Sequence, residues 1–166
     1  MNIVLAGRDL ERDEIFRLQQ EIIGAAGKSA VCMWIQCAGG EVKSSFGCYE
    51  TAMALLGDKL TTKAIGSVAS MGVIVFLAGA KRMIGRKTTL FLHPIILNNP
   101  PDSSFDRKQL RCLLYELEAL EKIYASIVSE RTGLSSKMVL RMMAKETTLD
   151  AEKAVRLGFA HEIFGQ

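Results

Sequence analysis

Two residues near the middle of the sequence carry the side chains that nucleophilic catalysis needs. Ser70 lies in an Ala-Ser-Met-Gly segment, where an expected strand gives way to an apolar helix, and His93 follows an apolar Leu-Phe-Leu run. A hydroxyl at a helix N-terminus lies beside free backbone N–H groups and the positive end of the helix dipole, which favour developing negative charge. Each residue also has a structural interpretation, Ser70 as a helix N-cap and His93 as a hydrogen-bonded structural histidine, and the two segments alone leave both interpretations open.

A glycine pair gives a second candidate site for binding through the backbone. Gly39 and Gly40 follow a continuous apolar run, and glycines there allow a tight turn and a close approach of substrate to an N–H group. The pair fits neither the GxGxxG dinucleotide motif nor a phosphate-binding loop, since no GK[ST] follows. The segment around Ser70 is not a GxSxG elbow, because residue 68 is Val. A plain strand–helix turn is the alternative for the glycine pair.

A catalytic triad also needs an acid to orient the histidine. No Asp or Glu lies between residues 60 and 96, so the acid must come from another part of the chain. Glu146 is one candidate, between an expected helix and a Thr-Thr-Leu extension. Asp150 is another, although it is typical of a helix N-cap. His161 has no glycine-rich turn beside it, and we expect it at the surface.

The hydrophobic pattern alternates between strands and helices over the first 93 residues. Strands are expected at 3–6, 30–35, 60–68, 82–84 and 88–92, and helices at 9–26, 42–57 and 70–80. In the first helix Ile15, Leu18 and Ile22, together with Phe16 and Ile23, recur at helical spacing. The βαβ order predicts an α/β domain with a mainly parallel sheet.

The chain changes character after His93. Residues 94–102 read as a loop, and Ser103 or Ser104 is expected to cap a helix that runs to about Arg131, roughly 40 Å long at 1.5 Å per residue. A helix of that length should extend beyond the sheet, so part of its apolar stripe is expected to contact a partner; the alternative is a helix lying flat on the sheet. Further helices are expected at 135–145, with Ser135 as cap, and at 151–157, followed by a strand at 159–164.

Composition narrows the function classes. The chain has 166 residues, 49% hydrophobic and 7% aromatic, with a net charge of +3, which excludes a disordered chain and gives no indication of nucleic-acid binding. The four cysteines match no zinc or CxxC spacing and are expected to be buried thiols, and with only two histidines we expect no metal and no cofactor. Without a signal peptide or an apolar run of membrane-spanning length, a cytoplasmic location is expected, with no membrane contact.

Four segments together resemble the Clp protease family, in the Clp protease/crotonase superfamily. They are residues 35–42 with the glycine pair, 66–72 with the following 78–82, 90–94 with His93, and 149–159 near the C-terminus. The resemblance implies an α/β fold of repeated β-α-β units with a long protruding handle helix. It implies a single domain over 1–166, in which 1–93 and 135–166 form a head and 94–134 form a handle loop and helix.

The resemblance also implies a site and a reaction. Ser70 would be the nucleophile of a serine endopeptidase, His93 its general base, and the N–H groups of Gly40 and Met71 its oxyanion hole. Glu146 stands where the family has its catalytic Asp. One departure from the family pattern is that Ala38 replaces the proline before the glycine pair.

The assembly that the resemblance implies is a homo-oligomeric ring that encloses the active sites and cleaves unfolded polypeptides or peptides. A face-to-face pair of seven-membered rings is the family's arrangement. The family's partner is a Clp-type unfoldase ATPase, and whether this chain has such a partner is left open. Two other functions are also kept. One is a catalytically impaired ring subunit or scaffold, because of the Glu at position 146, and the other is a crotonase-like enzyme acting on CoA thioesters.

Overall fold

The structure is a computed structural model that describes residues 1–7, 9–97 and 104–165. Its centre is a mainly parallel sheet in which β1, β2, β3, β4 and β7 follow one another, while β5 pairs with β3 and β6. β5 and β6 are antiparallel to each other, whereas the other pairs are parallel. The strands are β1 (Asn2–Ala6), β2 (Val31–Cys37), β3 (Leu60–Ala69), β4 (Lys81–Gly85), β5 (Thr89–Leu92), β6 (Thr147–Leu149) and β7 (Glu162–Phe164).

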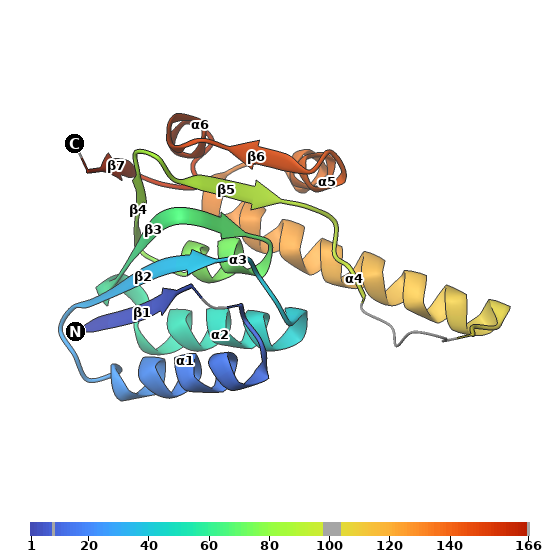
Figure 1. The fold of residues 1–166 in the computed structure, drawn as a ribbon, viewed down its shortest axis with the longest axis horizontal. Helices are drawn as coiled ribbons and strands as arrows, with labels where there is room; N and C mark the ends of the chain where they lie inside the picture. Colours follow the sequence, from blue (N-terminus) through green and yellow to red (C-terminus); the bar gives the residue numbers. More distant parts are fainter. Residues whose placement is uncertain (8, 98–103, 166) are drawn as a thin grey trace.

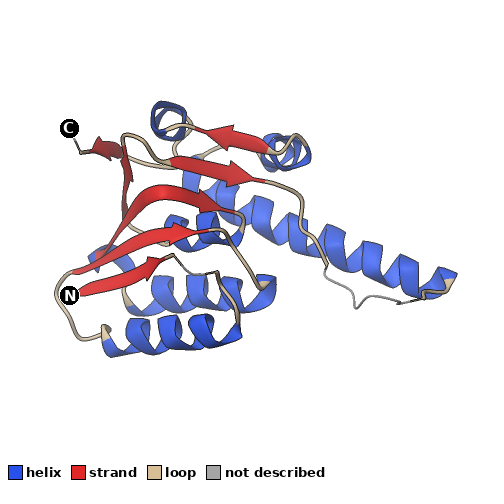
Figure 2. Ribbon diagram, in the orientation of Figure 1, coloured by secondary structure: helices blue, strands red, loops and turns tan. Residues whose placement is uncertain are grey.

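The helices connect these strands, and α1, α2 and α3 lie together on one side of β1, β2 and β3 (Figure 1). They are α1 (Arg12–Gly24), α2 (Val42–Leu55), the 3-10 turn η1 (Gly57–Lys59), α3 (Met71–Leu77), α4 (Arg107–Thr132), α5 (Ser136–Ala144) and α6 (Ala151–Arg156). The predicted α/β class, with its repeated β-α-β units and one long helix, is confirmed (Figure 2).

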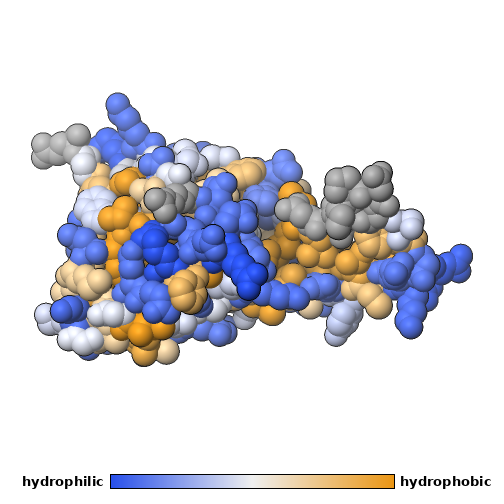
Figure 3. Space-filling model, turned by 60° about the horizontal axis from the view of Figure 1, so that its bottom comes forward, coloured by the Kyte–Doolittle hydropathy of each residue, from blue (hydrophilic) through white to orange (hydrophobic). Residues whose placement is uncertain are grey.

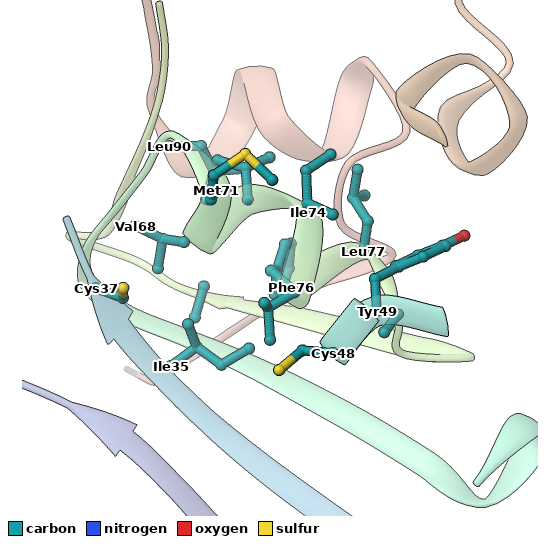
Figure 4. Packing of buried hydrophobic residues seen from close by; sticks show 14 of the residues in the cluster. Ile35, Cys37, Cys48, Tyr49, Val68, Met71, Ile74, Phe76, Leu77 and Leu90 are labelled. Carbon is teal, nitrogen blue, oxygen red and sulfur yellow. The ribbon is translucent and has the colours of Figure 1, made fainter. Parts of the chain in front are cut away.

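The short helix α3 is the centre of the core. Every one of its residues is buried, as expected for a helix without polar side chains. Figure 4 shows it between the strands and neighbouring helices, with Phe76 close to Ile35 and Cys48, and Met71 close to Leu90. The start of this helix is therefore held firmly against the ends of β2, β3 and β5.

β3 changes its partner along its length. Its first half, Thr61–Ala64, pairs with β4, and its second half, Ser67–Ala69, pairs with β5. Gly66 lies between the two halves. As a result, the carboxyl ends of β2, β3 and β5 meet at one edge of the sheet, where parallel α/β proteins form their ligand sites.

The two halves of α4 have different surroundings. The C-terminal half buries Leu120, Tyr124 and Val128 against the body of the protein. The N-terminal half projects away from it, and its Leu110 and Leu114 are more than half exposed (Figure 1). Figure 3 shows apolar surface along this projecting part. The expectation of a helix extending beyond the sheet is confirmed, and the flat-lying alternative is wrong.

The C-terminal ends of three helices meet around one buried arginine. Arg82 is 4% exposed, and its guanidinium donates hydrogen bonds to the carbonyls of Gly79 after α3, Arg131 in the last turn of α4, and Gly158 after α6. Its Nε donates to Phe159 O at 2.8 Å. Burial, followed by the charge of Arg131, lowers the pKa of Arg82 to about 10. The carbonyls supply the negative charge density that a buried cation needs.

Several local expectations were wrong. α1 begins at Arg12 rather than residue 9, and Phe16 and Ile23 are exposed, because the buried stripe of α1 is narrow and consists of Ile15, Leu18 and Ile22 besides Glu14. The last strand begins at Glu162 rather than at residue 159.

The cap of α4 also differs from the expectation. Asp106 caps the helix in a capping box with Gln109, while Ser104 precedes it and Ser103 lies outside the described residues, as does most of the expected loop. Ser135 caps the start of α5 as predicted. Glycines with positive φ follow the ends of α4 and α6, also as predicted. Of the cysteines, Cys37 and Cys48 are buried as expected, but Cys32 is only half-buried and Cys112 is exposed on α4.

Candidate active site

Ser70 lies at the junction of β3 and α3 in a strained backbone conformation. Its φ of 53° and ψ of −126° belong to a region that residues other than glycine rarely adopt, at a cost of about 1–3 kcal/mol. The conformation is held by a hydrogen bond from Ser70 N to Phe91 O at 2.9 Å and by one from Val73 N to Ser70 O at 3.0 Å. The side chain makes no capping hydrogen bond, so the interpretation of Ser70 as a plain N-cap is wrong.

The glycine pair lies directly against this serine. A Cβ on Gly39 would lie 2.5 Å from Ser70 Cβ and 3.0 Å from Ser70 Oγ, and a Cβ on Gly40 would lie 2.4 Å from Leu10 O. Both glycines have positive φ angles, 112° and 146°. The turn is held by Leu10 N donating to Gly39 O at 2.6 Å and by Gly39 N donating to Cys37 Sγ at 3.3 Å. These close approaches explain why glycine is required here, beyond a simple turn.

His93 follows the last residue of β5 and is half-buried. Its ring stacks on Phe91, with the ring centroids 5.5 Å apart, and its Nδ1 lies 2.6 Å from Pro94 O. Because a carbonyl oxygen can only accept, Nδ1 carries the proton in this hydrogen bond, and in the neutral ring the lone pair then lies on Nε2. The ring is therefore held in the tautomer that a general base needs.

These residues meet in one cleft. It has a volume of about 500 Å³ and brings Ser70, His93 and Gly40 together. The apolar part of its lining comes from the turn after β2, from α2, from the segment after β5 and from α4, namely Ala38, Val42, Ile95, Ile96, Leu97 and Leu120. The charged part consists of Glu11, Glu41, Lys43 and Glu116.

Two backbone N–H groups near Ser70 have no acceptor among the residues that the structure describes. Met71 is the first residue of α3, so its N–H has no acceptor within the helix. For Gly40, the pairing with Leu10 uses Gly39 O and the N–H of Glu41, and no acceptor for the Gly40 N–H occurs among the residues that the structure describes. Both amides belong to segments held beside Ser70 by the contacts above.

The two candidate acids lie in different settings. Asp150 accepts a hydrogen bond from Lys153 N at 2.8 Å, so it is the N-cap of α6, as its sequence context indicated. Glu146 is exposed, with a φ of 50°, and within the described ranges its carboxylate makes no hydrogen bond or ion pair. The antiparallel register pairs Leu92 with Thr147, so one further step would place Glu146 opposite His93.

Sequence reasoning missed the contacts that α4 makes with the site. Lys43 Nζ and Glu116 form an ion pair at 2.7 Å at the rim of the cleft, which raises the pKa of Lys43. Further along α4, Glu121 accepts the Ile95 N–H at 3.2 Å, and Tyr124 OH lies 3.4 Å from Ser70 O. The sequence signal in α4 is its periodic apolar stripe. That stripe predicts a buried helix face, but it does not reveal which strand ends the face contacts.

Among the described residues no group of three His, Cys, Asp or Glu side chains is placed to hold a metal ion. No helix in the same ranges is long and apolar enough to cross a membrane. His161 is exposed, as predicted, although its Nδ1 accepts the Arg82 N–H at 3.1 Å.

Comparisons with known proteins agree with this architecture. The family described as Clp protease matches residues 9–166. The "ATP-dependent Clp protease proteolytic subunit" of Deinococcus radiodurans is 27% identical over 139 residues, which cover 81% of this chain and 64% of that protein. Subunit 1 of Gloeobacter violaceus is 27% identical, covering 80% of this chain and 66% of its own, and subunit 2 of Chlamydia pneumoniae is 25% identical, covering 82% and 66%. The chain thus spans about two thirds of the length of these relatives. Because the family match covers nearly the whole sequence, the chain belongs to the Clp protease family.

Proposed function

We propose that this protein is a serine endopeptidase of the Clp type, with Ser70 as nucleophile and His93 as general base. The observation that carries the proposal is the strained Ser70 in a cleft shared with His93 and Gly40. Backbone strain of this kind persists only where surrounding contacts impose it, and it is concentrated at functional sites. Membership of the Clp protease family supports the same activity.

In this proposal Ser70 Oγ attacks the peptide carbonyl while His93 Nε2 takes its proton and later returns it to the leaving amine. The N–H groups of Gly40 and Met71 bind the oxyanion of the tetrahedral intermediate. One such preorganised donor contributes about 10²–10³ in rate. No cofactor or metal takes part.

Glu146 is proposed as the acid of the triad. Directly opposed residues of an antiparallel pair have Cβ atoms about 4.5–5.5 Å apart, which a glutamate side chain easily spans. The register of β5 and β6 leads toward such an opposition of Glu146 and His93. A turn of the exposed side chain would then direct the carboxylate to the imidazole.

The proposed substrates are unfolded polypeptides or peptides. The cleft joins an apolar lining, from Val42, Ile95 and Leu120, to a charged rim, which suits an extended chain with mixed side chains. The exposed apolar stripe on α4, with Leu110 and Leu114, supports assembly into a homo-oligomeric ring that encloses the sites. Stacking of two seven-membered rings, a Clp-type unfoldase partner and a cytoplasmic location complete the proposal by analogy with the family.

A catalytically impaired ring subunit is the second candidate function. It is favoured by one observation, the exposed carboxylate of Glu146, which makes no contact with His93 in the described chain. In that case the fold and the assembly would persist without turnover.

A fluorophosphonate probe separates the two functions, because it reacts only with an activated serine. Mass mapping should find the adduct on Ser70 and on no other serine, and Ser70→Ala should abolish it. Ser67→Ala is the matched control, since Ser67 is an exposed serine three residues earlier. A folded, assembled protein without the adduct would favour the scaffold.

A further inference from the structure

We propose that the main-chain carbonyl of Pro94 orients His93, so that the Ser70–His93 pair is competent before Glu146 approaches it. This rests on the proposed function of Ser70 and His93. The carbonyl oxygen lies 2.6 Å from Nδ1, a short distance for an N–H···O bond, and it can act only as acceptor. An acid in a triad has the same first task, which is to fix the proton on Nδ1 and leave Nε2 as the base.

The local sequence makes this carbonyl a fixed partner. The proline ring locks φ of Pro94 near −65°, and it restricts the preceding residue, His93, to extended conformations. The distance between the ring and the carbonyl therefore depends on few free torsions. Stacking on Phe91 holds the ring from one side, and Phe91 O also accepts the Ser70 N–H, so one residue of β5 fixes both partners.

The segment after the proline is fixed from the other side. Ile95 N donates to Glu121 of α4 at 3.2 Å, and Ile95 itself is buried. Pro94 is thus held between His93 at the end of β5 and an anchored residue. The carbonyl is a positioning group, because it acts on the substrate only through His93.

The proton balance of the step is complete without an added reactant. As Ser70 Oγ forms its bond to the substrate carbonyl carbon, the hydroxyl proton moves to His93 Nε2. The imidazolium keeps its Nδ1–H on Pro94 O. The Nε2 proton then passes to the leaving amine nitrogen as the C–N bond breaks.

The two histidines allow a direct test by spectroscopy. Pro94 O accepts from Nδ1 of His93, whereas Nδ1 of His161 accepts from Arg82 N–H, so the two rings carry opposite tautomers. Magic-angle-spinning spectra of the ¹⁵N-histidine-labelled protein at pH 8 should show one ring protonated at Nδ1 and one at Nε2. His93→Gln identifies the signals. The tautomer of His93 should persist in Glu146→Gln, and an Nε2-protonated His93 in either protein would overturn the proposal.

Kinetics give a second, independent test. Glu146→Gln and Glu146→Ala should each lower the rate constant of fluorophosphonate labelling no more than about tenfold, whereas losing the only orienting group of a triad costs about 10⁴. Pro94→Gly, which frees the carbonyl, should cost about tenfold alone and at least about 10³ when combined with Glu146→Gln. Glu118→Gln, an exposed carboxylate on α4, is the control.

The outcomes separate this inference from the proposed function. A loss of about 10⁴ in Glu146→Gln alone, or a double variant no slower than its slower parent, would overturn the role of Pro94 and leave the peptidase assignment intact. Absence of labelling in the wild type would instead count against the peptidase, and the histidine spectrum would still decide the orientation.

Discussion

Gly39 controls the position of the nucleophile through direct contact. Gly39→Ala would place a Cβ 2.5 Å from Ser70 Cβ, whereas carbon atoms pack at about 3.5 Å, so one of the two segments must retreat by about 1 Å. A misplacement of about 1 Å costs on the order of 10² in rate. The positive φ of Gly39 adds about 1–2 kcal/mol of strain for any L-residue. We therefore expect labelling of Ser70 to slow about 100-fold and the melting temperature to fall.

Gly133→Ala is the matched control, because Gly133 also has a positive φ, 81°, but no neighbouring heavy atom of the described residues lies within 4 Å of its added Cβ. It should lose about 1 kcal/mol of stability, equivalent to about 2–4 °C in melting temperature, and keep the labelling rate of the wild type. Rates are compared well below both melting temperatures. If Gly39→Ala labels within about threefold of the wild type while Gly133→Ala is destabilised as expected, the argument from the contact with Ser70 is refuted.

Three further predictions concern strain, pH and assembly. Ser70→Gly should be about 1 kcal/mol more stable than Ser70→Ala in thermal denaturation, because glycine tolerates a φ of 53°, and both variants should lose labelling; equal stability would contradict the strain. Burial, with the charges of nearby arginines, lowers the pKa of His161, so the unfolded state binds the proton more readily and stability should decrease as the pH falls below about 6.5. His161→Asn should flatten that dependence in melting curves, and an unchanged slope would assign it to other groups. Leu114→Glu should keep the subunit folded, because Leu114 is exposed, and reduce the particle mass in light scattering; an unchanged mass would exclude this part of α4 from the assembly.

The order of the elements could be predicted because each has a strong local pattern. The apolar runs of β2 and β3 and the uncharged α3 are unambiguous, and their alternation implies parallel strands with their carboxyl ends at one edge. That geometry brings Ser70, His93 and Gly40 into one cleft. Exposed apolar residues such as Phe16 could not be recognised, because helical spacing alone does not tell how wide the buried stripe is.

Other features of the site depend on torsions and register that no local pattern encodes. The positive φ of Ser70 follows from its hydrogen bond to Phe91 O on β5, a residue 21 positions away. The bond between His93 and Pro94 O is local, but it requires one particular ring orientation. Glu146 is exposed because the pairing of β5 with β6 ends at Leu92 and Thr147, one residue short of a direct opposition of His93 and Glu146.

The carbonyl cluster around Arg82 has a consequence for the order of folding. Its acceptors on Arg131, Gly158 and Phe159 lie 49, 76 and 77 residues further along the chain. Contacts between residues so distant in sequence form late, since the intervening chain must first be ordered. We expect the N-terminal βαβ units to be structured in the folding transition state while Arg82 still lacks most of its acceptors.

The same reasoning applies to synthesis on the ribosome and to unfolding. The guanidinium of Arg82 cannot be buried with all its acceptors until residue 159 has left the ribosome. Until then the charged side chain should keep this part of β4 in contact with water. A substitution at Arg82 should therefore accelerate unfolding and hardly slow refolding, as expected for contacts absent from the transition state. The contacts of Arg82 would thus form after the transition state, and they would set the unfolding rate and so the lifetime of the folded subunit.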